Sequence, residues 1–149
     1  MNYQSPQYSP NTQLSIFPPA VKHLLIINLL AFVALSTPVV SDYLFTYGAL
    51  WPIDSGRFGV WQLISYMFLH AGFGHIFFNL FALWMFGQAI ENFWGTNRFV
   101  IYYFLTGIGA ALLHMLIGGG GAPTLGASGA VYGILLAFGM MFPNRPIML

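Results

Sequence analysis

The sequence contains no cysteine and very few charged residues. The lack of cysteine excludes disulfide bonds, thiolate metal sites and a cysteine nucleophile. Only 5% of the 149 residues are charged, whereas a soluble domain usually carries roughly 25%. So few charges cannot cover a surface that faces water. The 58% of hydrophobic residues therefore indicate a protein that folds in a lipid bilayer.

Basic charge and cofactor motifs are also scarce. Four Lys and Arg oppose three Asp and Glu, for a net charge of +1, so there is no basic stripe for binding nucleic acid. His70 and His75 are five residues apart, off a common helical face and without acidic neighbours, which argues against a metal site. Gly118 to Gly121 lack the Lys and Ser or Thr of a phosphate loop. We expect no cofactor, and we interpret the glycine run as a re-entrant loop.

Long apolar segments are what the chain does contain. A helix needs about 20 mainly apolar residues to cross the hydrocarbon layer, and four segments approach this length: residues 21–40, 73–93, 99–117 and 127–142. Residues 41–72 are rich in Trp and Tyr, which favour the headgroup level, and predict an interfacial loop with short helical pieces. Residues 1–19 are polar and predict a flexible tail. The fold class expected is an all-α membrane protein with about four transmembrane helices.

The basic residues predict the orientation, because cytoplasmic loops carry an excess of Lys and Arg. With the N-terminus in the cytoplasm, Lys22, Arg98 and Arg145 lie inside and only Arg57 lies outside. The opposite orientation would place three of these four residues outside. The outer ends of the second and fourth predicted helices are then their N-terminal ends.

Three polar residues share that outer side. His75 and Asn79 are four residues apart, on one face of the second helix, and Ser128 begins the fourth helix. Polar side chains at this depth cost free energy unless they pair or line a watery cavity. His75 and Asn79 are also explained by hydrogen bonds between helices, worth about 1 kcal/mol. The serine, too, has a structural explanation, since it precedes the small residues Gly129, Gly133 and Ala137, which allow close helix packing.

Ser128 nevertheless stands in a favourable position for nucleophilic attack. Gly126 and Gly129 flank it and permit tight backbone geometry. The N–H groups at a helix start lack intrahelical partners and attract an anion, and donors from His75 or Asn79 would add to an oxyanion hole. The soluble hydrolase elbow, Gly-x-Ser-x-Gly after a strand, does not fit, because residue 130 is Ala and no strand precedes.

With these residues in view, the chain resembles the rhomboid intramembrane serine proteases. The matching stretches are HAGFGHIFFN at 70–79 and GASG at 126–129, and Glu91 before Gly95 and Arg98 resembles the acidic residue and turn of that family. The similarity covers roughly residues 20 to 145. The resemblance implies a rhomboid-like helical bundle over residues 20–149.

The resemblance also implies roles for these residues. Ser128 would attack a peptide bond in a transmembrane segment of a substrate protein and form an acyl-enzyme, while His75 and Asn79 would stabilise the oxyanion. Gly126, Gly129, His70 and Glu91 would have structural roles near the site. The implied partners are transmembrane protein substrates and the lipid bilayer. We predict an integral protein of a bacterial inner membrane, with residues 1–19 in the cytoplasm.

The chain departs from the family pattern in two places. Rhomboid proteases use a histidine on their sixth core helix as general base, whereas here no His follows Ser128 and the sequence ends at Leu149. We therefore expect a chain truncated at its C-terminus. The family's Trp-Arg pair appears as Trp61-Gln62. His114, near the outer end of the third helix, is an alternative base, although a pore-facing or packing role is favoured because the rotation of the helix is unknown.

Two function classes follow from these patterns. The leading hypothesis is an intramembrane serine endopeptidase that lacks its base in this chain. The alternative is a catalytically inactive rhomboid-like protein that binds transmembrane helices. A transporter or channel is a weaker third hypothesis, because the sequence lacks paired intramembrane charges and a broken-helix repeat.

Overall fold

The computed structural model describes residues 14–117 and 121–144. These residues form six α-helices and two short 3-10 helices. In chain order they are α1 (Pro19–Leu35), α2 (Pro38–Gly48), η1 (Ile53–Ser55), α3 (Gln62–Ser65), η2 (Tyr66–Phe68), α4 (Phe73–Trp94), α5 (Thr96–Ile117) and α6 (Ser128–Met141). Within the described ranges, the only β-type pairing is an isolated bridge between Leu50 and Thr124. The expected all-α fold is confirmed.

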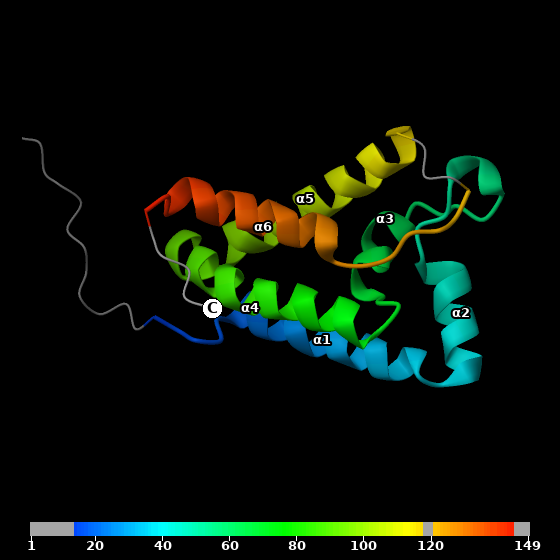
Figure 1. Ribbon diagram of the computed structural model, residues 1–149, viewed down its shortest axis with the longest axis horizontal. Helices are drawn as coiled ribbons and strands as arrows, with labels where there is room; N and C mark the ends of the chain where they lie inside the picture. Colours follow the sequence, from blue (N-terminus) through cyan, green and yellow to red (C-terminus); the bar gives the residue numbers. More distant parts are fainter. Residues whose placement is uncertain (1–13, 118–120, 145–149) are drawn as a thin grey trace, which may run out of the picture.

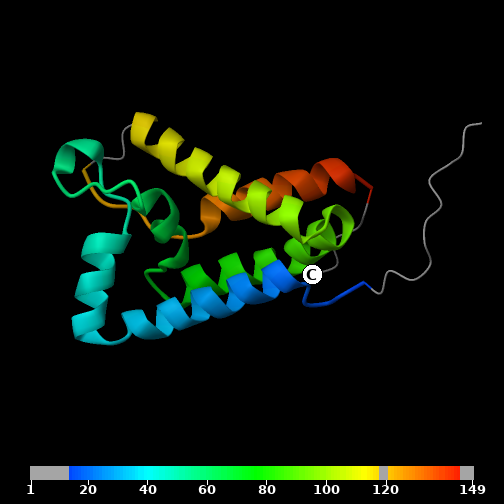
Figure 2. The ribbon, with the colours of Figure 1, turned by 180° about the vertical axis from the view of Figure 1, so that it is seen from behind.

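Four long helices make up the bundle. α1 lies alongside α4, and α6 packs against both α4 and α5 (Figures 1 and 2). α2 runs across the end of the bundle where α1 finishes (Figure 1). The short helices α3 and η2 lie between α2 and the beginning of α6 (Figure 1). The N-terminal ends of α4 and α6 therefore face the same group of short helices.

The first apolar segment divides at a proline. The predicted span over residues 21–40 was wrong at its end, since α1 stops at Leu35 and a second helix starts at Pro38. Proline has no N–H to continue a helix, and it forces the preceding residue into extended geometry. Thr37 has that geometry, with φ −97° and ψ 117°. The predicted short helical pieces of residues 41–72 are confirmed as the rest of α2, η1, α3 and η2.

The remaining three apolar segments are confirmed as helices, within three residues at each end. α4 and α5 have 22 residues each and are long and apolar enough to cross a membrane, since 22 residues extend about 33 Å. α1, with 17 residues, and α6, with 14, are shorter apolar helices. Among the described residues, two of the four predicted spans thus meet the length criterion on their own.

The region predicted as a flexible tail is described only from residue 14 onward, and residues 1–13 lie outside the described part. The backbone N–H of Ser15 donates to Asn92 Oδ1 over 3.1 Å, and Asn92 Nδ2 donates to the Ser15 carbonyl over 2.8 Å. The Phe17 ring stacks on Trp84 with centroids 6.2 Å apart. The last residues before α1 therefore lie against α4.

Glu91 joins three helices at one end of the bundle. Its buried carboxylate accepts hydrogen bonds from the N–H groups of Ala20 and Val21, over 2.9 and 2.8 Å, and from Thr96 Oγ1 over 2.7 Å. The N–H groups of a first helical turn lack intrahelical partners and carry partial positive charge. A carboxylate in this position stabilises the start of α1 and fixes it to α4 and α5.

Small residues bring α6 close to α5. A Cβ added at Gly129 would lie 2.4 Å from Ala110 Cβ, and one added at Gly133 would lie 2.6 Å from Thr106 Cβ. Tyr102 adds a hydroxyl that donates to the Gly133 carbonyl over 2.7 Å. Both glycines of the predicted small-residue stripe therefore lie at a helix contact too close for larger side chains.

Candidate active site

The first two turns of α4 carry His75 and Asn79. The four-residue spacing places them on one helical face, and their side chains are half-buried and buried, respectively. Asn79 Nδ2 donates to the His75 carbonyl over 2.9 Å. One amide hydrogen of Asn79 is thus used within the helix, while a primary amide carries two. The second hydrogen and the His75 ring are the polar groups that α4 offers to the site.

The segment leading to α6 is held by backbone hydrogen bonds to residues far away in the sequence. Thr124 exchanges two backbone hydrogen bonds of 2.9 Å with Leu50, and the Gly126 N–H donates to the Tyr66 carbonyl over 2.9 Å. The Ala127 N–H donates to His70 Nε2 over 3.5 Å. These contacts fix the path of the chain immediately before Ser128.

Ser128 is the first residue of α6 and is half-buried. The first helical hydrogen bond runs from the Val131 N–H to the Ala127 carbonyl over 3.0 Å. The preceding N–H groups, from Ser128 to Ala130, have no intrahelical acceptor, as at the start of any α-helix, and no side chain of the described residues caps this end. Such groups point toward an incoming anion. Ser128, which the sequence predicts as the nucleophile, therefore lies in the same helical turn as these backbone N–H donors.

His75 contacts the segment immediately before this turn at Gly126. A Cβ built on Gly126 would lie 2.6 Å from His75 Nε2 and 2.7 Å from its Cε1, and the glycine has φ +124°. Only glycine adopts this backbone geometry readily. The imidazole of α4 therefore lies against the backbone two residues before Ser128. Among the described residues, no hydrogen bond joins Ser128 Oγ to either His75 or Asn79.

His70 supports the same backbone from a buried position. Its ring is 2% exposed and lies edge-on to His75, with centroids 5.0 Å apart. Burial, together with the neighbouring charge of His75, lowers the pKa of His70 to about 4. A neutral ring has a nitrogen that can accept the Ala127 N–H, which a protonated ring does not. His70 is therefore a buried residue that accepts a hydrogen bond from the backbone immediately before Ser128.

Tyr66 was missed by the sequence analysis. Its carbonyl accepts the Gly126 N–H, and its hydroxyl donates to the Gly107 carbonyl over 2.7 Å. Burial raises the pKa of Tyr66 to about 12, so the hydroxyl keeps its proton. The tyrosine links the segment before Ser128 to α5. No spacing or motif in the sequence singles it out among eight tyrosines.

Other candidate residues do not lie at this site. Glu91 is at the opposite end of α4 from His75, about 24 Å along the helix axis, so it is not beside the serine. His114 has an exposed side chain near the end of α5. Within residues 14–117 and 121–144, no group of three or more His, Asp or Glu residues could hold a metal ion. The glycine loop predicted at 118–121 falls largely outside the described residues.

Comparisons with known proteins match this region of the chain. The model of the Rhomboid domain matches residues 57–149, which is more than half of the sequence. The chain is 37% identical over 75 residues to rhomboid protease GluP of Bacillus subtilis. It is 32% identical over 97 residues to the mitochondrial Rhomboid protein 1 of Saccharomyces cerevisiae, and 34% identical over 89 residues to a putative rhomboid protease, YdcA, of Bacillus subtilis.

These relatives are longer than the matched region. The alignments cover 50%, 59% and 58% of this chain but only 14%, 27% and 45% of the respective relatives. The chain therefore spans less than half the length of each. Together with the apolar helices, the matches identify an integral membrane protein.

Proposed function

Since the chain belongs to the rhomboid family, we propose that it carries the nucleophile and the oxyanion donors of an intramembrane serine endopeptidase. The observation that supports this most directly is the contact between His75 and Gly126, two residues before Ser128. It brings the polar end of α4 to the first turn of α6. Ser128 is the nucleophile, and His75 and Asn79 stabilise the oxyanion.

The reaction follows from these groups. The Ser128 oxygen forms a bond to the carbonyl carbon of a peptide, and the electron pair of the carbonyl moves to its oxygen. The N–H groups of the first turn of α6, the His75 ring and the second Asn79 amide hydrogen stabilise that negative charge, and losing one such donor costs roughly 3 kcal/mol. When the C–N bond breaks, the leaving amine takes the proton that the base had accepted from Ser128, and the acyl group stays on Ser128 until water releases it.

A serine hydroxyl needs a base to accept its proton. No histidine follows Ser128 in this sequence, and the resemblance to rhomboid proteases implies a base on a later helix. We therefore assign the nucleophile and the oxyanion donors to this chain, and not the base. His114 is less suited to the role, because its side chain is exposed and makes no hydrogen bond to the first turn of α6 among the described residues.

The substrates we propose are transmembrane segments of other proteins. The bonds cleaved lie near the outer membrane surface, because His75 and Ser128 occupy helix ends that the distribution of Lys and Arg places outside. The same distribution of basic residues favours a cytoplasmic position for residues 1–19. We propose that residues 20–149 form the membrane domain. We propose a bacterial inner membrane as its location.

A second candidate function is binding of transmembrane helices without cleavage. The hydrogen bond that occupies Asn79 Nδ2 favours it. In this case the chain keeps the rhomboid scaffold while Ser128 is not activated. The two functions differ in the reactivity of a single hydroxyl.

Fluorophosphonate labelling of the purified protein, in a form that includes the base, tests this difference, since only an activated serine reacts. The endopeptidase proposal expects labelling that Ser128→Ala abolishes, while Ser41→Ala, at a half-buried serine of α2, leaves it unchanged. Labelling that persists in Ser128→Ala would refute the assignment of the nucleophile. If the wild-type protein that includes the base is not labelled, the result favours the non-catalytic alternative.

The oxyanion assignment has its own matched pair on α4. Asn79→Ala is expected to slow labelling about 100-fold, the effect of losing one oxyanion donor. Asn92→Ala changes the same residue type at the other end of the helix, where the side chain binds Ser15, and is expected to leave the rate unchanged. Equal rates in Asn79→Ala and the wild type would remove Asn79 from the site.

A further inference from the structure

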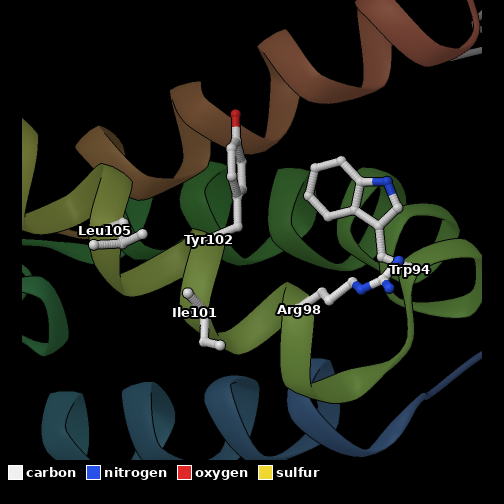
Figure 3. A pocket seen from close by; sticks show the side chains of 5 residues that line it. All are labelled: Trp94, Arg98, Ile101, Tyr102 and Leu105. Carbon is white, nitrogen blue, oxygen red and sulfur yellow. The ribbon is translucent and has the colours of Figure 1, made fainter.

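A groove opens along α5 at the opposite end of the bundle from Ser128. Its volume is about 420 Å³, and it is lined by Trp94, Arg98, Ile101, Tyr102 and Leu105 (Figure 3). Ligand pockets in proteins typically measure about 300–1,000 Å³. From Arg98 onward, the lining residues follow the i, i+3, i+4 and i+7 spacing of one helix face. The groove is therefore long, with a cation at one end and apolar side chains at the other.

The aromatic wall of the groove is held in place. The Trp94 and Tyr102 rings meet edge to face with centroids 5.1 Å apart. The Tyr102 hydroxyl donates to the Gly133 carbonyl on α6, which fixes the ring between the two helices. The other wall consists of Ile101 and Leu105, which are 59% and 63% exposed. A ligand would find this shape already formed.

The cation at the end of the groove is Arg98. No carboxylate among the described residues pairs with Arg98, whose side chain is exposed and extends toward Trp94 (Figure 3). Glu91, the acidic residue nearest in the sequence, already accepts three hydrogen bonds from Ala20, Val21 and Thr96. A guanidinium in this position is available for an anion, and its planar donors suit a phosphate.

The position along the bundle matches a lipid headgroup. Glu91 holds the start of α1 beside the start of α5, so Arg98 lies at the same end of the bundle as Lys22. The distribution of basic residues places this end in the cytoplasm, where the leaflet carries anionic lipids. The apolar wall formed by Ile101 and Leu105 then extends from Arg98 toward the middle of the membrane, along the path of an acyl chain.

We infer that this groove binds a phospholipid with an anionic headgroup, with its phosphate on Arg98 and one acyl chain along Ile101 and Leu105. The complementarity of charge at one end and of apolar surface along the rest distinguishes this ligand from a free phosphate, which would leave the apolar part unfilled. The inference does not depend on proteolysis, so it stands or falls separately from the proposed function.

Native mass spectrometry of the full chain in mixed micelles tests the inference. With equal amounts of phosphatidylglycerol and phosphatidylcholine, the wild type is expected to retain phosphatidylglycerol preferentially. Arg98→Gln should lower this retention about fivefold, the effect of one cation near the membrane surface, while Lys22→Gln, an exposed cation at the same end of the bundle, should not. Equal losses in both variants, or no preference in the wild type, would overturn the inference.

Two further measurements separate the competing occupants. Inorganic phosphate should displace the lipid no better than chloride at the same ionic strength, and displacement by phosphate alone would overturn the lipid assignment. Since the chain has no native cysteine, Leu105→Cys provides a unique cross-linking site. Efficient oxidative dimerisation there would show that a second copy fills the groove and would contradict the proposal, whereas the absence of cross-linking supports a lipid. The melting temperature of each variant in detergent verifies that it is folded.

Discussion

The imidazole of His75 lies against the backbone of Gly126, so closely that a Cβ at residue 126 would be 2.6 Å from Nε2. Gly126 also has φ +124°, a geometry that other residues rarely adopt. His75 of α4 therefore packs against the segment that leads to α6, at a position that only glycine can fill. This contact defines the relation between α4 and Ser128.

The first prediction concerns Gly126→Ala. The added methyl group must displace the His75 ring, so we expect the fluorophosphonate reaction of Ser128 to slow by about 10-fold to 100-fold, as for small misplacements of catalytic groups. Gly121→Ala is the control, because Gly121 has φ +75° with no atoms within 4 Å of an added Cβ. Both variants strain the backbone, and a similar loss in both would show that strain alone accounts for the effect.

A second prediction concerns the contact between α6 and α5. Gly129→Val places a branched side chain where a Cβ alone would lie 2.4 Å from Ala110 Cβ. We expect a loss of about 1–3 kcal/mol in the free energy of unfolding, which is typical of overpacking. Gly139→Val makes the same change on the same helix with open space around it. Thermal unfolding in detergent distinguishes the two, and equal melting temperatures would disprove the close contact.

The third prediction tests Glu91 as the anchor of α1. Glu91→Gln replaces one carboxylate oxygen with an N–H group that faces backbone donors, so we expect a loss of about 1–3 kcal/mol in stability. Asp54→Asn, which neutralises an exposed carboxylate of η1, should change stability by less than about 0.5 kcal/mol. Detergent unfolding curves measure both, and a neutral Glu91→Gln would mean that the hydrogen bonds to Ala20 and Val21 contribute little.

The fourth prediction is a dependence of stability on pH that arises from His70. Its pKa is about 4 in the folded chain and about 6.5 when unfolded, so the unfolded state binds more protons between these values. Stability is therefore complete above about pH 6.5 and falls as the pH drops toward 4, by at most about 3 kcal/mol. Melting temperatures of the wild type and His70→Gln should converge on acidification.

His23→Gln serves as the control for this experiment, because His23 has an exposed side chain on α1. It should retain the pH dependence of the wild type. If His70→Gln instead keeps the full slope between pH 6.5 and 4, another group is responsible.

The sequence predicted the helices after residue 73 well because no proline interrupts the apolar segments 73–93, 99–117 and 127–142. The prediction of one continuous helix was wrong between residues 36 and 40, because the apolar composition of this stretch does not show that Pro38 makes the preceding backbone extended. Hydropathy counts residues over a window, whereas a proline acts at a single peptide bond. The position of α2 could have been inferred from that proline.

For the site, the sequence predicted which end of each helix carries polar residues, and therefore which residues share a depth. It could not predict the contact of His75 with Gly126 or the role of Tyr66. Both depend on the path of the segment before α6, which the Leu50 and Thr124 backbone bonds determine. Pairing between backbones so distant in the sequence leaves no periodic pattern. Glu91 shows the reverse case, where a motif was recognised but its distance from the serine was not considered.

The most direct test of the account is a high-resolution structure of the fluorophosphonate adduct on Ser128. If His75 and Asn79 form the oxyanion site, the phosphonyl oxygen points between them. It then lies within hydrogen-bond distance of at least one of their side chains and of an N–H group in the first turn of α6. An adduct whose oxygen faces the lipid, or a bond to a serine other than Ser128, would contradict it.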